Sequence, residues 1–239
     1  MRRVKAEAAA GAETDTREAA GRDDLGTLLR SLVRPVWRTL PRRALATAGV
    51  LGLLLAGSTR LPDQAPDEEL GLLVLRVIAL VGALGLAFLL DDPARNTSAA
   101  APVGRVLRTA LRLGLAAPLA AVWWTTAVLL IPSAARPHAA LVTLEAAATA
   151  VGALALATTA VRFTDFAEVG RNTAIRLGSV AAVMFLVPSR WGLLTTPEDR
   201  WWEATHLRWA VLLLLTLAIC TAWTPEPLKR RRHGRPTGA

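Results

Sequence analysis

The feature that most constrains this chain is a series of long apolar segments with few or no charges. Most are about 18–21 residues long, which is the length that crosses a hydrocarbon core of about 30 Å as a helix. These segments raise the hydrophobic share of the 239 residues to 53% and the mean hydropathy to +0.37, whereas soluble domains are roughly 45–50% apolar. The pattern excludes a soluble globular enzyme, a disulfide-stapled secreted domain and a disordered chain. It predicts an all-α, polytopic integral membrane protein.

The number of spans follows from the number of such segments. Pro188 and Arg190 interrupt the fifth segment, and the sixth is short, so we expect both to be short, tilted or extended by their flanks. The six predicted transmembrane helices are Ala44–Leu61, Leu70–Leu90, Leu113–Ile131, Ala139–Val161, Leu177–Leu194 and Trp209–Trp223.

The distribution of Lys and Arg predicts the orientation of these spans. If the N-terminus is cytoplasmic, most basic residues near the spans lie on the cytoplasmic side, and the first outer loop is acidic. The positive-inside rule then places both termini in the cytoplasm. We expect a multi-pass protein of the cell membrane. Contact between Arg side chains and anionic lipid also accounts for the net charge of +9, so no nucleic-acid partner is expected.

The segments outside the spans differ in composition. The first residues mix Ala, Gly and both charge signs without apolar periodicity, so they cannot form a core. Beyond them, apolar residues at helical spacing alternate with Arg30, Arg34 and Arg38, which is typical of a helix lying in the membrane interface, although Pro35 would also allow two short helices. The predicted organisation is a disordered cytoplasmic tail (1–24), an amphipathic interfacial helix (25–43), a six-helix transmembrane domain (44–223) and a basic cytoplasmic tail (224–239).

Two ionisable residues, Arg76 and Glu145, lie inside predicted spans, where charge is costly and usually functional. Arg76 is in the second span and Glu145 in the fourth, each about 9 Å below the outer boundary at 1.5 Å per residue. Equal depth permits a salt bridge. The functional hypothesis is that the pair lines or gates a polar path. In the alternative, Arg76 extends to the interface and Glu145 is protonated or paired for structural reasons.

A polar and aromatic group in the middle of the third span is a second candidate. Its members are Trp123, Trp124, Thr125 and Thr126. They are candidates to line a pathway for an amphipathic substrate, and ordinary helix packing is the alternative. Near the last outer loop, Trp201–Leu207 is predicted to form a short helix at the interface.

Known catalytic and metal-binding motifs are missing from the sequence. It contains no P-loop, HExxH, CxxC, GxSxG or EF-hand pattern, and His138, His206 and His233 are all assigned to loops or the tail. We therefore predict no catalytic, cofactor-binding or metal-binding residue and no enzyme activity. Asp91 and Asp92 lack the third carboxylate of a metal-diphosphate motif.

Several features together resemble the permease subunits of bacterial ABC transporters of the exporter-like ABC-2 class, in particular the small six-span proteins encoded beside ATP-binding subunits in actinomycetes. The resemblance rests on the cationic helix before the first span, the cytoplasmic termini, the interfacial segment before the sixth span, and the sequences LLDDPARNTSAA and LEAAATA. It implies an ABC ATP-binding subunit as partner, a homodimer or a heterodimer with another permease, and contact with membrane lipids. It also implies that the loop after the second span couples to the ATPase, through Asp91, Asp92, Arg95, Arg105 and Arg108.

Two other classes of function stay open. A non-transporting membrane scaffold or anchor would recruit a cytosolic partner through the basic tail Lys229–Arg235. A membrane-embedded enzyme would depend on Asp91, Asp92 and Glu145, although no full catalytic constellation accompanies them.

Overall fold

The computed structural model describes residues 41–61, 67–90, 105–163, 169–188 and 190–223. Every regular element in these ranges is helical, which confirms the all-α prediction for this part of the chain. The elements are α2 (Arg42–Ser58), α3 (Glu68–Ala87), η1 (Phe88–Leu90), α4 (Arg105–Leu130), η3 (Ser133–Ala135), α5 (Ala139–Phe163), α6 (Val169–Leu186) and α7 (Trp202–Trp223). The predicted tails 1–24 and 224–239, and most of the predicted interfacial helix 25–43, lie outside the described residues.

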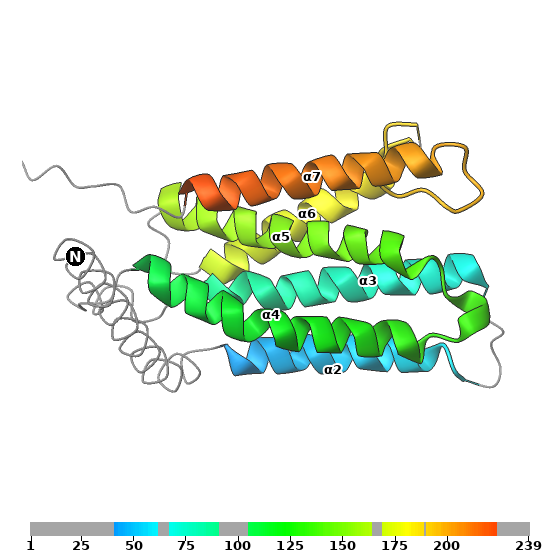
Figure 1. The fold of residues 1–239 in the computed structure, drawn as a ribbon, viewed down its shortest axis with the longest axis horizontal. Coiled ribbons are helices and arrows are strands. Elements are labelled where there is room, and N and C mark those ends of the chain that lie inside the picture. The colour runs from blue at the N-terminus through cyan, green and yellow to red at the C-terminus, as the bar shows by residue number, and fades with distance from the viewer. Residues whose placement is uncertain (1–40, 62–66, 91–104, 164–168, 189, 224–239) are drawn as a thin grey trace, which may run out of the picture. The chain divides into compact units, whose positions relative to one another are not determined.

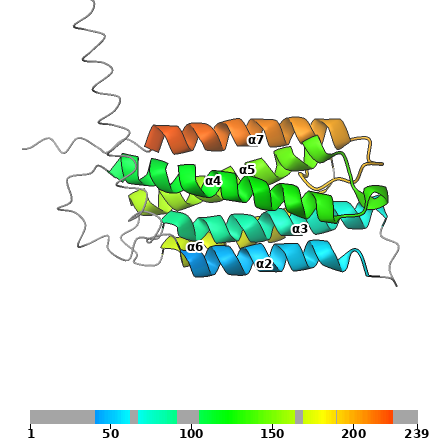
Figure 2. The same ribbon diagram turned by 60° about the horizontal axis from the view of Figure 1, so that its bottom comes forward.

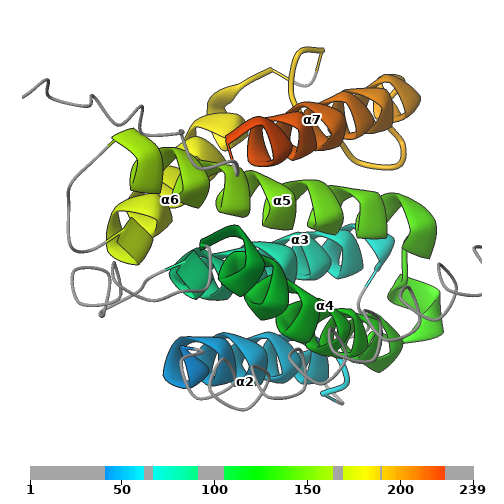
Figure 3. The same ribbon diagram turned by 60° about the vertical axis from the view of Figure 1, so that its left-hand side comes forward.

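The helices form an up-and-down bundle (Figure 1). α2, α4 and α6 run in one direction, and α3, α5 and α7 run in the other, as the colours in Figures 1 and 2 show. We term the end at which α3, α5 and α7 begin the distal end. α5 is central, because it packs against α3 on one side and α7 on the other (Figure 3).

Four helices in the described part of the chain are long and apolar enough to cross a membrane: α3, α4 from Thr109, α5 and α7. The helices α2 and α6, with 17 and 18 residues, do not meet these requirements of length and apolar composition together. Large apolar side chains also face outward, and Leu54, Val122 and Leu214 are each about two-thirds exposed. A soluble protein rarely exposes so much apolar surface, but a bundle solvated by lipid does.

The interior is small and apolar. The main buried cluster joins α2, α3, α4, η3 and α5, and its largest members are Leu72, Leu75, Ile78 and Ile131. A second cluster of Ala83, Ala153 and Leu177 joins α3, α5 and α6. Alanine and glycine at these contacts allow the helix backbones to approach closely.

The start of α3 is fixed by its sequence. The Asp67 side chain accepts a hydrogen bond of 2.8 Å from the Leu70 amide, and Glu68 and Glu69 follow in the first turn. Carboxylates at these positions bond to free amides and interact favourably with the positive end of the helix dipole.

The last two helices differ from the predicted spans. α6 begins earlier than Leu177 and ends at Leu186, because Pro188 disfavours helical geometry in the residue before it. α7 begins at Trp202, where the Trp202 amide donates to the Asp199 carbonyl at 2.9 Å. The predicted interfacial helix Trp201–Leu207 is therefore not a separate element but forms the first turns of α7. This extension gives the sixth predicted span a helix of 22 residues.

Candidate functional site

The structure brings Arg76 of α3 and Glu145 of α5 together at the distal end in a two-pronged ion pair. Arg76 Nε lies 2.7 Å from Glu145 Oε2, and Arg76 Nη2 lies 2.8 Å from Oε1. The side chains are 15% and 3% exposed. This fork geometry uses both carboxylate oxygens and is among the strongest neutralising contacts available to a buried carboxylate.

Arg76 also contacts the segment that joins α6 to α7. Its Nη1 donates to the carbonyl of Thr195 at 2.9 Å. The same segment is held by α7, because Arg208 Nη1 donates to the Gly192 carbonyl and Trp209 Nε1 donates to the Leu193 carbonyl, both at 2.9 Å. Thr195 is thus positioned by hydrogen bonds from both sides.

His206 is the third ionisable member of the site, and its predicted place in a loop was wrong. It lies in α7 rather than in a loop, and it is 6% exposed. Its Nδ1 lies 2.9 Å from the Trp202 carbonyl oxygen, and its Nε2 lies 3.3 Å from Glu145 Oε1. The second contact is within ion-pair distance but does not meet hydrogen-bond geometry. The Trp202 ring packs edge-on against the imidazole, with ring centroids 4.4 Å apart.

We call Arg76, Glu145, His206 and the Thr195 carbonyl the polar cluster. It links α3, α5, α7 and the segment before α7 in the interior of the bundle. Thr195 itself and Thr205, the residue before His206, each have a buried hydroxyl group without a hydrogen-bond partner. Buried polar groups in a membrane protein are costly, so such a concentration at one point indicates a specialised role.

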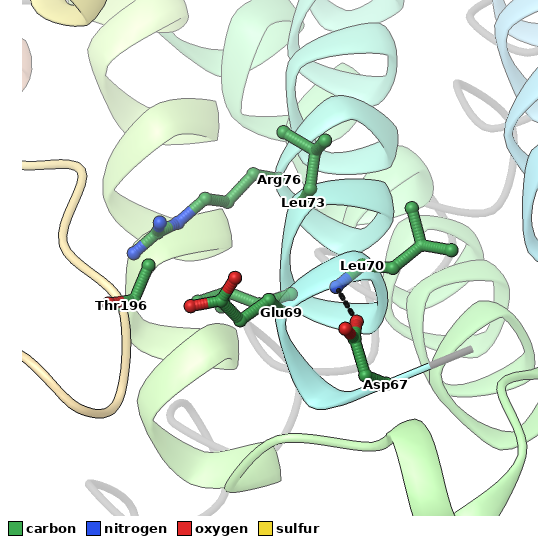
Figure 4. A pocket seen from close by; sticks show the side chains of 7 residues that line it. Asp67, Glu69, Leu70, Leu73, Arg76 and Thr196 are labelled. Carbon is green, nitrogen blue, oxygen red and sulfur yellow. Dashed lines mark hydrogen bonds between the residues drawn. The ribbon is translucent and has the colours of Figure 1, made fainter.

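A pocket of about 390 Å³ opens beside the polar cluster (Figure 4). Arg76 is part of its lining, and Asp67 and Glu69 at the start of α3 give the lining two carboxylates. Figure 4 shows Arg76 extending toward the segment that holds Thr196. The full lining consists of Asp67, Glu69, Leu70, Leu72, Leu73, Arg76 and Thr196.

The predicted pathway residues of α4 do not line this pocket. Trp123 packs between α2 and α3, and its Nε1 donates to the Gly49 carbonyl at 2.9 Å. Trp124 Nε1 donates to Thr143 Oγ1 at 3.0 Å. The hydroxyls of Thr125 and Thr126 donate to carbonyls one turn earlier in α4 and are exposed. In this structure the two indoles connect helices, which corresponds to the packing alternative.

The predicted coupling loop lies mostly outside the described residues. Asp91, Asp92 and Arg95 are among the residues that are not described, and Arg105 and Arg108 are in the first turn of α4. Their role in coupling therefore stays a prediction.

Sequence reasoning missed His206 because the start of the sixth span was set at Trp209. The signal was present in the sequence, since a helix that starts at Trp202 places His206 within its second turn from the distal end, close to the depth of Glu145. The Thr195 carbonyl had no signal in the sequence, because every residue type has a backbone carbonyl.

Comparisons of the chain with protein-family models, with curated proteins and with solved structures find no match.

Proposed function

We propose that this protein is the membrane-spanning permease subunit of an ATP-driven ABC export system, working with a separate ATP-binding subunit. The observation that supports this proposal best is the polar cluster, a set of buried ionisable groups linking three helices of an apolar bundle. Ionisable residues within membrane spans are characteristic of transport pathways and their gates. The sequence resemblance to ABC-2 permeases supports ATP hydrolysis in the partner subunit as the energy source.

In the proposed topology, all six long helices cross the cell membrane and both termini are cytoplasmic. α2 and α6 have 17 and 18 residues, which corresponds to about 26 and 27 Å of helix at 1.5 Å per residue. These lengths are slightly short of a 30 Å hydrocarbon core, and local thinning of the bilayer or basic flanking residues would accommodate them.

In this topology the polar cluster lies on the outer side and acts as a gate. With the Arg76–Glu145 pair formed, α3 and α5 are held together and the path is closed outward. Closure of the ATPase on the cytoplasmic side would separate these helices. A difference in substrate affinity between the two states would then make the cycle transport substrate. The permease would act as a homodimer or with a related subunit.

Purification of the intact complex tests the proposal. The tagged full-length chain is cross-linked in its native membranes, purified in mild detergent and analysed by quantitative mass spectrometry. We expect an ATPase with Walker motifs in near-equal amount, and loss of that ATPase when Asp91, Asp92 and Arg95 are all changed to Ala.

Glu68→Gln is the matched control, because it also removes a carboxylate but lies exposed at the distal end. It should retain the ATPase. If a cross-linked complex forms without any ATPase, and deletion of 224–239 removes the captured protein, the permease proposal is wrong and the chain is a scaffold.

A further inference from the structure

We infer that the polar cluster contains a proton-binding site between His206 Nε2 and Glu145 Oε1. The inference concerns the chemistry of the cluster itself and holds for any function of the protein. It rests on the two atoms that the His206 ring nitrogens face, and on how Arg76 fixes the charge of Glu145.

The Trp202 carbonyl determines which nitrogen of the His206 ring carries a hydrogen. This nitrogen lies 2.9 Å from the Trp202 carbonyl oxygen, which has no hydrogen to donate. The contact is favourable only if Nδ1 carries the proton and donates it. A neutral imidazole with its proton on Nδ1 has a lone pair on Nε2.

Glu145 accepts hydrogen bonds from Arg76 at both carboxylate oxygens, at 2.7 and 2.8 Å. This is the geometry of a guanidinium–carboxylate ion pair. Within that pair, Glu145 Oε1 is an anionic acceptor that lies 3.3 Å from His206 Nε2.

The protonation states of His206 differ in how well they suit its two contacts. If the proton is on Nδ1 alone, the Nε2 lone pair faces an anionic oxygen, and if it is on Nε2 alone, the Nδ1 lone pair faces the Trp202 carbonyl oxygen. Only the imidazolium form, with a proton on each nitrogen, makes both contacts attractive. The second proton binds at Nε2, and a small shift of either side chain would convert the 3.3 Å contact into a full hydrogen bond.

The surrounding charges are compatible with a bound proton. The cluster then contains two cations, Arg76 and His206, and one anion, Glu145, while Asp67 and Glu69 in the adjoining pocket supply negative charge. On α7, Arg208 is bonded to the carbonyls of Arg190 and Gly192, and Glu203 is exposed. In the segment before α7, Asp199 accepts a hydrogen bond from the Trp201 amide.

Loss of the proton has a mechanical consequence. A neutral His206 would have to turn or withdraw from Glu145, because one of its two contacts becomes repulsive. Proton binding therefore holds the start of α7 against the α3–α5 pair, and proton release loosens it. This couples the bound proton to helix position at the distal end.

Solid-state NMR of the full-length chain in phospholipid vesicles tests the site. The protein is labelled with ¹⁵N-histidine, and the shifts of the ring nitrogens distinguish protonated from bare nitrogen between about pH 5 and pH 8. His206→Gln assigns the signals of His206 by their loss. His138→Gln is the matched control, because His138 is exposed and its loss should leave those signals unchanged.

We expect a population of His206 with a proton on each ring nitrogen. Glu145→Gln should lower that population, because the neutral amide attracts the imidazolium less. A His206 that is singly protonated at every pH tested would overturn the inference, as would a doubly protonated population that Glu145→Gln leaves unchanged.

A measurement without any substitution keeps the test decisive if Glu145→Gln fails to fold. The distance between ¹⁵Nε2 of His206 and ¹³Cδ of Glu145 is measured in the wild-type chain at both ends of the pH range. The distance should be short when His206 is doubly protonated and should lengthen when the proton leaves. An unchanged distance, with Nε2 bare throughout, would refute the site.

Discussion

At the scale of single residues, the cost of burying charge explains why Arg76 and Glu145 are found together. Neither side chain is stable alone in an apolar bundle, and their pairing removes most of that cost. A buried pair contributes little net stability relative to apolar residues of similar size, so its presence is better explained by a role in the bundle's conformation or activity than by folding alone.

Charge reversal tests this interdependence. Arg76→Glu and Glu145→Arg should each destabilise the protein by about 3–5 kcal/mol, because each leaves two like charges buried together. The double reversal should recover part of the loss, with a coupling energy of about 0.5–3 kcal/mol in a thermal or denaturant double-mutant cycle. Strictly additive losses would contradict the pairing. Glu198→Arg, at an exposed carboxylate, is the control and should change stability by less than about 0.5 kcal/mol.

The site could be predicted only in part from the sequence. Arg76 and Glu145 were identifiable because two charges in apolar segments are conspicuous and helical rise gives their depth. His206 was missed, because its assignment depended on where α7 begins, and local patterns define helix boundaries poorly. The bond from Arg76 to the Thr195 carbonyl depends on tertiary structure and has no sequence signature.

At the scale of helices, glycine allows close contact at specific points. A Cβ at Gly71 would lie 1.8 Å from the Ala135 carbonyl oxygen, so α3 and η3 touch through this position. A Cβ at Gly52 or Gly82 would lie 2.3 or 2.7 Å from the nearest ring atom of Trp123, which explains how that indole fits between α2 and α3.

Substitution of Gly71 should therefore be costly. Gly71→Ala forces α3 away from η3, and overpacking of this kind costs about 1–3 kcal/mol. Gly178→Ala in α6 is the matched control, since a Cβ there meets nothing within 4 Å and alanine favours helix. Thermal unfolding in detergent should show a lower midpoint for Gly71→Ala and an equal or higher one for Gly178→Ala. Equal midpoints for both variants would disprove the close contact.

The indole of Trp123 provides a separate test. Trp123→Phe keeps an aromatic ring but removes the donor to the Gly49 carbonyl, and we expect a loss of about 0.5–1.5 kcal/mol plus a smaller packing term. Denaturant titration measures it. Under the permease proposal, transport should persist if Trp123 connects helices, whereas a selective loss of transport without loss of stability would support the pathway interpretation.

Prediction of the helices themselves was more successful than prediction of their ends. Apolar composition identified the six long helices found in the described part of the chain, because each needs an apolar surface. Composition did not show that the segment Trp202–Arg208 belongs to α7. Its hydrogen bonds to the preceding segment and its ion-pair contact with Glu145 depend on the folded bundle.

At the scale of the whole molecule, the alternating direction of the helices makes the proposed topology measurable (Figure 1). In a Cys220→Ala background, single cysteines are placed at Ser133, at the distal end, and at Lys229, in the C-terminal tail. A membrane-impermeant maleimide added to intact cells should label Ser133→Cys and should label Lys229→Cys only after permeabilisation. Labelling of Lys229→Cys in intact cells would place the C-terminus outside and contradict the six-span proposal.

The members of the polar cluster are far apart in the chain. Arg76 and Glu145 are separated by 69 positions, and His206 follows later still. During synthesis from the N-terminus, α3 is made before the carboxylate that pairs with Arg76, and the cluster is complete only when α7 has been made. A charge inside a membrane helix is costly without its partner. A chain truncated before α5 would therefore contain Arg76 without the contact that holds it in the finished bundle.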